Sequence, residues 1–361
     1  MADKLSCILV IIPTLNRANY LSVTLDSLCN QIIGTGEYSV LIVDNGSTDN
    51  TKEIVETIIK KHSKHKIRYV YEPEPGLLSG RHRGALEAEG EILVFVDDDI
   101  EAEKGWLQAI QDTFDDPTVQ IVGGRNLPKY EKEPPDWLNW FWSKHPFGRT
   151  CGWLSLLDFG ENIREIDANY VWGLNFSIRK SALFELGGFH PDCVPKNLQH
   201  FQGDGETALT IKANELGYKA VYQPKALIYH RVPGSRMTYE YFDNRFFYQG
   251  VCNSFTDIRR KHGKYKAIER KIKINLKEKI KASCVFRMQK IINCLRKKTE
   301  EEKLKERFRQ SFSNGYQFHQ DAVRKNPELL KWVLRNDYWD YRLPKIYSQT
   351  NQVFEICSPI I

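Results

Sequence analysis

The sequence predicts an α/β fold, in which a mostly parallel central sheet is flanked by helices and followed by a helical C-terminal extension. Over residues 1–100, short apolar runs alternate with amphipathic stretches, and this alternation is typical of parallel strands joined by crossover helices. Three of the four apolar runs end in polar residues, where sheets of this kind bind ligands. After about residue 258 the alternation stops and a lysine-rich stretch with apolar residues at helical spacing begins. We therefore expect one domain over residues 1–257 and a basic, mainly helical extension over residues 258–361.

The elements expected in the first hundred residues follow from their periodicity. Apolar, β-branched runs bounded by turn residues predict strands, and apolar residues three or four apart predict helices. Ser47 or Thr48 in front of an apolar stripe is typical of a helix start. Strands are expected at residues 6–13, 38–46, 66–72 and 91–99, and helices at residues 19–31, 47–62 and 76–90.

Beyond residue 100 the pattern is less regular. A short helix at 105–114 and a strand at 119–124 precede a loop over 130–159 that holds four of the chain's eight tryptophans. The elements expected after this loop are a strand, a glycine turn, a second strand and a helix start over 169–189, a helix over 203–218, and a pair of strands over 219–233 that ends at His230.

Composition and charge exclude several classes of protein. No stretch reaches the eighteen or so uncharged apolar residues of a membrane span, and the N-terminal residues lack a signal-peptide pattern, so we expect a soluble, cytoplasmic protein. The eight cysteines show no CxxC or zinc-type spacing, which favours reduced thiols. The net charge is +6, but residues 259–298 alone hold sixteen Lys or Arg and two Glu, so the rest of the chain is acidic.

Polar side chains follow three of the predicted strands at the point where each strand ends. They come after the first, the second and the fourth strand, and parallel strands bring such ends to one edge of a sheet. Each group alone could be explained as a turn or a helix cap, but three together indicate a binding site. The groups are Pro13, Thr14, Asn16 and Arg17; Asp44 and Asn45; and Asp97, Asp98 and Asp99.

The three adjacent aspartates indicate a divalent cation. Alternate residues of an extended chain point the same way, so Asp97 and Asp99 are expected to face one object together, with Asp98 turned elsewhere. Hard oxygen ligands suit Mg²⁺ or Mn²⁺, and phosphate oxygens of a substrate commonly complete the coordination of such an ion. The sequence has no GxxxxGK[ST] loop, so we expect a nucleotide diphosphate held by other means.

In these motifs and their order, the chain resembles the glycosyltransferases of family 2, which have the GT-A fold. The resemblance covers roughly residues 7 to 240, and seven motifs in the correct order make it specific. The motifs are VIIPTLNR at 10–17, VDNGSTD at 43–49, GLLSGRHRG at 76–84, DDD at 97–99 with WL at 106–107, the glycine loop at 173–175, the acidic segment before the helix that ends in Gly217-Tyr218, and His230.

The resemblance implies a role for each of these residues. Asp44 would recognise the nucleotide base, and Arg81 would reach the nucleotide or its diphosphate. Asp97 and Asp99 would hold Mn²⁺ or Mg²⁺, and His230 would complete the coordination. The other residues implied in nucleotide-sugar binding are Pro13, Thr14, Asn16, Arg17, Asn45, Asp98 and Gly173.

Two acidic residues are candidates for the catalytic base. Counting back from Gly217-Tyr218 and Leu209 places the base at Glu206, with Asp204 as the second candidate. The family commonly has a second acid directly before the base, but this chain has Gly205 there. The resemblance implies an inverting mechanism, in which a carboxylate deprotonates an acceptor hydroxyl that attacks the anomeric carbon.

The expected partners are a nucleotide sugar, with UDP as the first candidate, and a glycan or lipid-linked acceptor of a cell-surface polysaccharide or glycoconjugate pathway. Trp137, Trp140 and Trp142 are candidates for acceptor contacts, with ordinary packing as an equal alternative. Residues 259–310 could pack on the body or contact the inner face of a membrane peripherally, and no nucleic-acid-binding module accompanies their charge. Two other functions stay open: a catalytically degenerate binding protein, and a nucleotidyltransferase on a similar scaffold.

Overall fold

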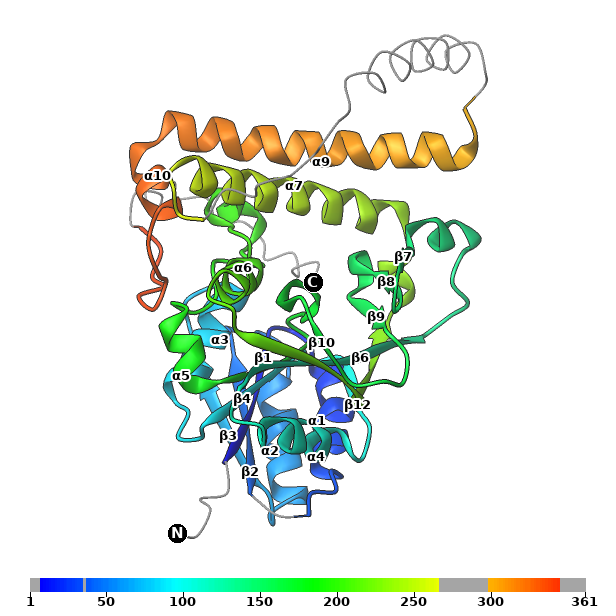
Figure 1. Ribbon diagram of the computed structural model, residues 1–361, viewed down its shortest axis with the longest axis vertical. Helices are drawn as coiled ribbons and strands as arrows, with labels where there is room; N and C mark the ends of the chain where they lie inside the picture. The colour runs from blue at the N-terminus through cyan, green and yellow to red at the C-terminus, as the bar shows by residue number, and fades with distance from the viewer. Residues whose placement is uncertain (1–6, 35–36, 266–297, 345–361) are drawn as a thin grey trace.

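A large mixed sheet forms the centre of the protein, and helices cover both of its faces (Figure 1). The computed structural model describes residues 7–34, 37–265 and 298–344. The α/β fold predicted from the sequence is confirmed. One core lies between the sheet and α1, α2 and α4, and a second core lies between the opposite face and α3, α5 and α6. These helices are α1 (Ala18–Cys29), α2 (Thr51–Lys61), α3 (Leu77–Leu86), α4 (Trp106–Phe114), α5 (Lys180–Glu185) and α6 (Thr207–Glu215).

The first strand shows why the chain builds two cores. In β1 (Ile8–Thr14) every residue is buried, and Ile8, Val10 and Ile12 enter one core while Leu9 and Ile11 enter the other. Alternate residues of a strand point to opposite faces, so a continuous apolar run suits a strand that is covered on both sides.

The N-terminal half of the sheet is parallel, as expected. Its strand order is β3-β2-β1-β4, with Thr14 of β1 level with Asp44 of β2. This register brings the carboxyl ends of the strands to one edge of the sheet. The other strands of this half are β2 (Tyr38–Asp44), β3 (Lys66–Tyr71) and β4 (Ile92–Val96).

The second half of the sheet joins mostly by antiparallel pairing. β11 (Asn175–Arg179) lies antiparallel between β4 and β6 (Val119–Tyr130), and β12 (Lys219–Val232) then runs parallel to β6. The pair of strands predicted over 219–233 is one long strand, because β12 continues through a register irregularity between Gln223 and Ile228. The remaining strands are β5 (Ile100–Ala102), β7 (Ser143–His145), β8 (Gly148–Cys151), β9 (Leu156–Asp158) and β10 (Arg164–Ile166).

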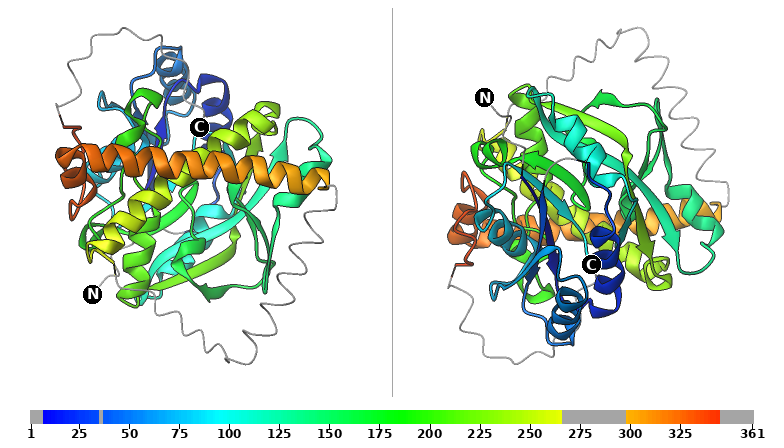
Figure 2. Two further views of the ribbon diagram at one scale, coloured as in Figure 1. Left: turned by 90° about the horizontal axis from the view of Figure 1, so that it is seen from above. Right: turned by 90° about the horizontal axis from the view of Figure 1, so that it is seen from below.

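Two long helices cross above the sheet at close range (Figure 2). They are α7 (Tyr239–Lys261) and α9 (Glu300–Lys325), and α10 (Pro327–Val333) follows. A Cβ on Gly250 would lie 2.1 Å from the carbonyl oxygen of Phe312, and one on Gly315 would lie 1.9 Å from that of Phe247. The two backbones therefore touch at positions where only glycine fits.

The C-terminal helices share the core of the N-terminal part. Val323, Leu329 and Trp332 are buried in the same cluster as β1 and α3. The domain boundary predicted at residue 257 falls inside α7. Most of the basic stretch on which a membrane contact was predicted, residues 266–297, lies outside the described residues.

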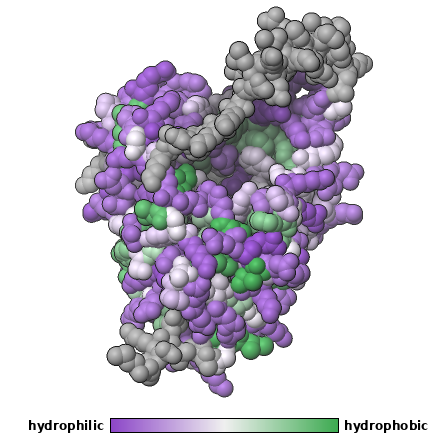
Figure 3. Space-filling view, viewed as in Figure 1, coloured by the Kyte–Doolittle hydropathy of each residue, from purple (hydrophilic) through white to green (hydrophobic). Residues whose placement is uncertain are grey.

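The visible surface is mainly hydrophilic, and apolar residues form small groups on the face drawn in Figure 3. Within the described part of the chain, no helix has the length and apolar character needed to cross a membrane.

Candidate active site

The three aspartates occupy a turn between two strands. β4 ends at Val96, so the acids are not the end of a strand, as the sequence predicted, but the connection to β5. Thr24 of α1 fixes this turn, because its hydroxyl contacts the carbonyl oxygens of Asp98 and Ile100 and accepts the amide hydrogen bond of Ile100. The alternation expected for an extended chain does not apply to this turn, and the three aspartates differ in their contacts, although Arg17 pairs with both Asp98 and Asp99.

Asp98 points into the protein. Its Oδ2 accepts a hydrogen bond from the Thr14 hydroxyl at 2.6 Å, and its Oδ1 accepts one from Arg17 Nε at 3.3 Å. Burial raises the pKa of Asp98 to about 7, although Arg17 opposes this. Thr14, Arg17 and Asp98 therefore tie the end of β1 to the acid turn.

Asp99 is buried among cations. Arg17 and Arg236 both form ion pairs with its Oδ2, the second at 2.8 Å, and His230 Nε2 lies 3.4 Å from its Oδ1. Burial raises the pKa of Asp99, but Arg236 and His230 outweigh it and hold this pKa well below its ordinary value. Asp97 is the most open of the three, with 30% of its side chain exposed, and Arg81 Nη2 lies 4.0 Å from it. Burial and the nearby Asp99 raise the pKa of Asp97.

The donor chemistry of this turn fits a divalent cation. Asp99 Oδ1 is buried without a hydrogen-bond partner, and such an orphaned oxygen is a candidate ligand. His230 Nδ1 hydrogen-bonds to the Leu154 carbonyl at 2.9 Å, so Nδ1 carries the proton and Nε2 keeps its lone pair. Nε2 accepts from Arg236 Nη1 at 2.8 Å. The described residues contain no ready cluster of three or more His, Cys, Asp or Glu around one point.

The ends of β1 and β2 are joined by side chains from the predicted set. Asn16 has a φ of 55°, and its Oδ1 accepts from the Thr48 amide at 2.7 Å, which closes the two loops on each other. Asp44 is buried and accepts from the Ser47 amide at 2.8 Å and from the Tyr69 hydroxyl at 2.6 Å. Burial, assisted by this contact, raises the pKa of Tyr69 well above its ordinary value.

Asn45 also makes hydrogen bonds at the carboxyl edge of the sheet. Its side-chain amide donates to the carbonyl oxygens of Glu72 and Glu74, at 3.2 and 2.5 Å. The carbonyl oxygen of Thr14 accepts from the Asn45 amide at 2.8 Å, and Pro13 precedes it in β1. The strand register thus places Pro13, Thr14, Asp44 and Asn45 side by side, as predicted for a ligand-binding edge.

Arg81 connects the acid turn to the predicted base. Its guanidinium lies against Gly173, where a Cβ would be 2.1 Å from Nη2, so glycine is required there for packing. Its Nη1 lies 3.4 Å from Glu206 Oε2, while the amide of Gly173 donates to Glu206 Oε1 at 3.2 Å. Arg81 therefore brings Asp97, Gly173 and Glu206 together, although α3, β4 and α6 are far apart in sequence.

The two candidate bases have different surroundings. Glu206 retains 25% of its side-chain exposure, whereas that of Asp204 is 1%. Asp204 accepts from His190 Nδ1 at 2.8 Å, from Thr256 at 2.6 Å and from Tyr265 at 3.3 Å. Burial opposes ionisation, but the contact with His190 lowers the pKa of Asp204 below its ordinary value. The geometry therefore favours Glu206 for chemistry.

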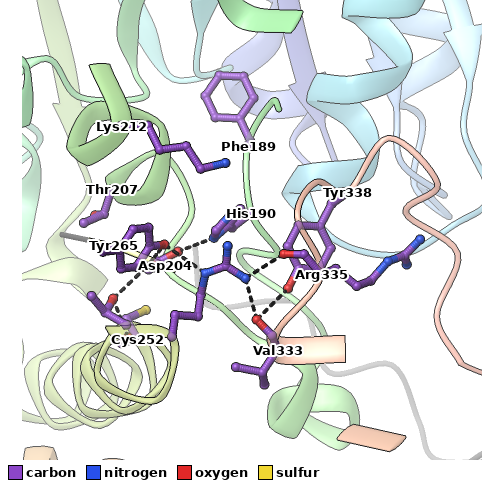
Figure 4. A network of polar contacts seen from close by, with 12 residues as sticks. Phe189, His190, Asp204, Thr207, Lys212, Cys252, Tyr265, Val333, Arg335 and Tyr338 are labelled. Atoms are coloured by element: carbon purple, nitrogen blue, oxygen red, sulfur yellow. Dashed lines mark hydrogen bonds and ion pairs between the residues drawn. The ribbon is translucent and has the colours of Figure 1, made fainter. Parts of the chain in front are cut away.

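Asp204 belongs to a local network of polar contacts between segments that are far apart in the sequence (Figure 4). Arg259 of α7 donates to the Tyr265 hydroxyl at 3.1 Å and to the carbonyl oxygens of Val333 and Arg335. The network ties the loop before α6 to α7 and to the segment after α10.

The predicted acceptor tryptophans lie in an aromatic cluster between the sheet extension and the long helices. Trp137 packs edge-on against Phe242 of α7 with centroids 5.0 Å apart. Trp140 and Trp142 are partly buried in the same cluster, and Arg149 stacks over Trp142 at 4.6 Å. Packing accounts for much of their surface, and their contact with an acceptor stays a prediction.

The structure adds residues that the sequence analysis missed. Arg236 follows β12 in a short 3-10 helix and pairs with Asp99. Asp192 lies beside Gly205, whose Cβ would be 2.8 Å from Asp192 Oδ2. The proximity of Arg236 to His230 in the sequence was a usable signal, but no local pattern marks Asp192.

Comparisons with known proteins agree with this geometry. The family model described as "Glycosyl transferase family 2" matches residues 9–186. A glucosyl-dolichyl phosphate glucuronosyltransferase from Haloferax volcanii is 27% identical over 188 residues, which cover 51% of this chain and 56% of the relative. Glycosyltransferase AglE from the same organism is 32% identical over 124 residues, covering 34% of this chain and 40% of the relative. The chain thus spans about half the length of these curated relatives.

One solved structure supports the fold. A mannosyltransferase from Pyrobaculum calidifontis, in complex with GDP-Man and Mn²⁺, aligns with a TM-score of 0.50 and 22% identity. The alignment covers 70% of this chain and 64% of the other.

Proposed function

The chain belongs to glycosyl transferase family 2, and on that premise we propose that it transfers a sugar from a nucleotide-diphosphate donor to an acceptor hydroxyl. The observation that carries the proposal is that Arg81 joins the acid turn and Glu206 at the carboxyl edge of the sheet. The donor complex of the solved neighbour is consistent with it.

In the proposed reaction, Glu206 takes the proton of the acceptor hydroxyl. The acceptor oxygen forms a bond to the anomeric carbon, and the bond from that carbon to the donor's phosphate oxygen breaks, so the nucleotide diphosphate leaves with the electron pair. Attack opposite the leaving group inverts the configuration. Arg81 lies where it can stabilise the charge on the departing diphosphate.

A divalent cation, Mn²⁺ or Mg²⁺, would be held by Asp97, Asp99 and His230. Bound there, it would neutralise charge on the diphosphate as that group leaves. Arg17 and Arg236 pair with Oδ2 of Asp99 and leave Oδ1 for the cation, whereas Arg236 also occupies His230 Nε2, so binding by His230 requires Arg236 to release that nitrogen.

The proposed donor is a UDP-sugar and the proposed acceptor a glycan or lipid-linked glycan of a cell-surface pathway. The relative that acts on a glucosyl-dolichyl phosphate supports the acceptor class. Peripheral contact of residues 259–310 with a membrane belongs to the same proposal, and flotation with liposomes of anionic lipid tests it.

Thermal unfolding against UDP, GDP, dTDP and CMP, each with and without Mn²⁺, tests the function. A ligand that binds only the folded state stabilises it, by about 2.7 kcal/mol at a concentration of one hundred times its Kd. We expect one nucleotide to raise the Tm with Mn²⁺, and Asp99→Ala to abolish that increase. The surface variant Asp112→Asn, far from the acid turn, is the matched control.

The same experiment separates the alternatives. A nucleotide-dependent shift without metal-dependent hydrolysis of the corresponding nucleotide sugar would favour the degenerate binding protein. No shift with any nucleotide would contradict the proposed donor class.

A further inference from the structure

A second carboxylate, that of Asp192, stands next to the predicted base, although the residue directly before that base in the sequence is Gly205 and not an acid. The segment around Asp192 is fixed against the loop before α6, because the amide of His190 donates to the Gly205 carbonyl at 3.0 Å. The carbonyl of Asp192 itself accepts from the amide of Leu77, at the start of α3, at 3.0 Å. Asp192 is thus placed between the helix that carries Arg81 and the loop that carries Glu206.

The Asp192 side chain is held by only one of its oxygens. Oδ1 accepts from the Cys193 amide at 2.8 Å, and Cys193 has a φ of 47°, which bends the chain at this point. Oδ2 occupies the space over Gly205, 2.8 Å from where a Cβ would be. Among the described residues, Oδ2 has no hydrogen-bond donor, and the side chain is only partly buried.

Asp192 and Glu206 are neighbouring carboxylates, and the guanidinium of Arg81 lies close to both. Burial and the neighbouring Glu206 raise the pKa of Asp192 to about 6, and Arg81 and Arg245 of α7 oppose that rise. The other titratable groups that act at this point are Cys193 and Asp97, through their effect on Arg81. At neutral pH, Asp192 is mainly ionised and offers a free acceptor oxygen.

We propose that Asp192 binds the acceptor, by accepting a hydrogen bond from the hydroxyl beside the one that Glu206 deprotonates. This inference rests on the proposed function. It gives the acceptor a chemical class: a sugar with two neighbouring hydroxyls. A phosphate acceptor is already ionised, so it needs no base, and a pair of carboxylates repels it.

The test measures nucleotide release from the glucose, galactose, mannose and glucuronic acid conjugates of the nucleotide that the thermal panel identifies. The acceptor probes are methyl β-glucoside, methyl β-galactoside, methyl α-mannoside and decyl phosphate, with products verified by mass spectrometry. We expect at least one glycoside to accelerate release and to be glycosylated, and decyl phosphate to do neither.

Asp192→Asn is the discriminating variant, because asparagine keeps the oxygen that binds the Cys193 amide and changes the free one. We expect the half-saturating glycoside concentration to rise about tenfold or more, which is the usual loss for a hydrogen bond to a charged group. Asp112→Asn, an exposed aspartate on α4, should match the wild type.

A second variant moves the acid instead of removing it. The three atoms nearest to a Cβ at position 205 all belong to Asp192, so Asp192→Gly empties the space that Gly205→Asp would need. Aspartate tolerates the left-handed φ of 56° at this position. We expect the double variant to recover the glycoside dependence that Asp192→Asn loses, and Gly205→Asp alone to be crowded. The Tm of each variant verifies folding.

Three results would overturn the inference while the proposed function stands: glycosylation of decyl phosphate but of no glycoside, no acceleration by any glycoside, or an Asp192→Asn variant that saturates like the wild type. Absence of nucleotide release by the wild type would overturn the proposed function and this inference with it.

Discussion

Asp204 and Glu206 are two residues apart, yet they belong to different regions of the molecule. Asp204 is enclosed, and His190, Thr256 and Tyr265 all donate to it. Glu206 pairs with Arg81, and its side chain is partly exposed. A carboxylate whose oxygens accept hydrogen bonds from several protein groups stabilises the fold. A carboxylate with an accessible oxygen can bind a ligand. The comparison shows that spacing along the chain selects a segment, and only its surroundings select the residue.

The largest effect is expected for Glu206→Gln. Removal of a general base lowers kcat by about 10² to 10⁴-fold. The glutamine keeps a side-chain oxygen beside the buried Arg81 but loses the charge, so we expect the free energy of unfolding to fall by about 1 to 3 kcal/mol. Transfer kinetics and urea unfolding measure the two quantities. A variant that unfolds readily but keeps its kcat would reverse the roles that we assign to the two acids.

Asp204→Ala should do the opposite. It leaves three buried donors without their acceptor, so we expect the free energy of unfolding to fall by about 3 to 5 kcal/mol. Urea denaturation measures the loss, and activity should follow the folded fraction. Asp204→Asn keeps one acceptor oxygen and should lose less. A stable Asp204→Ala with abolished turnover would instead make Asp204 the base.

The network around Asp204 also predicts acid sensitivity. Burial lowers the pKa of His190 to about 4, from an ordinary value of 6.5. The unfolded chain therefore binds the proton first, so stability is full above pH 6.5 and falls as the pH decreases towards 4. The loss attributable to His190 is about 2.5 kcal/mol at about pH 4.5.

His190→Asn tests this assignment by removing the titrating ring while keeping a donor for Asp204. We expect its free energy of unfolding to vary less between pH 6.5 and 4.5 than that of the wild type. His319 and His82, whose pKa values burial also lowers, to about 4 and about 3, remain in the variant and contribute to the remaining slope. An unchanged slope would show that His190 does not contribute.

The smallest effect is expected for Trp142→Ala, which tests whether this aromatic residue contacts the acceptor or only packs within the protein. Loss of the stacking with Arg149 should cost about 0.5 to 1 kcal/mol of stability. If Trp142 contacts the acceptor, the acceptor KM rises and the donor KM does not. Trp153→Ala is the control, because Trp153 stacks on Phe246 in the same cluster and was not predicted to bind acceptor. An unchanged acceptor KM would leave Trp142 with packing alone.

The parallel half of the sheet was predictable because each of its strands and helices has its own hydrophobic pattern in the sequence. β1 to β4 are apolar runs of strand length separated by amphipathic helices, and their polar ends meet at one edge. The continuous strand β12 was not predictable, since Pro224 and Lys225 interrupt its pattern and its continuity depends on pairing with β6. Hydrophobic periodicity alone does not show which other strand a given strand pairs with.

The candidate site was predictable where it depends on residue type and order. The acid turn, Arg81 and Glu206 converge, as the motifs predicted. The inward role of Asp98 depends on Thr14, 84 residues earlier, and on the turn that replaces the expected strand end. Asp192 escaped prediction because its importance comes from the missing Cβ of Gly205, a contact between two loops that leaves no periodic signal.

The crossing of α7 and α9 has a consequence for recombination between relatives. Gly250 and Gly315 leave no room for a methyl group where the two backbones touch, and both lie beyond the segment that matches the family. On either side of Gly250, α7 holds Arg245, which acts electrostatically on Asp192, and Thr256, which donates a hydrogen bond to Asp204. A chimera that takes α7 from one parent and α9 from another would therefore alter the spacing of the helices and, with it, both acidic regions. A functional chimera would therefore have to take α7 and α9 from the same parent.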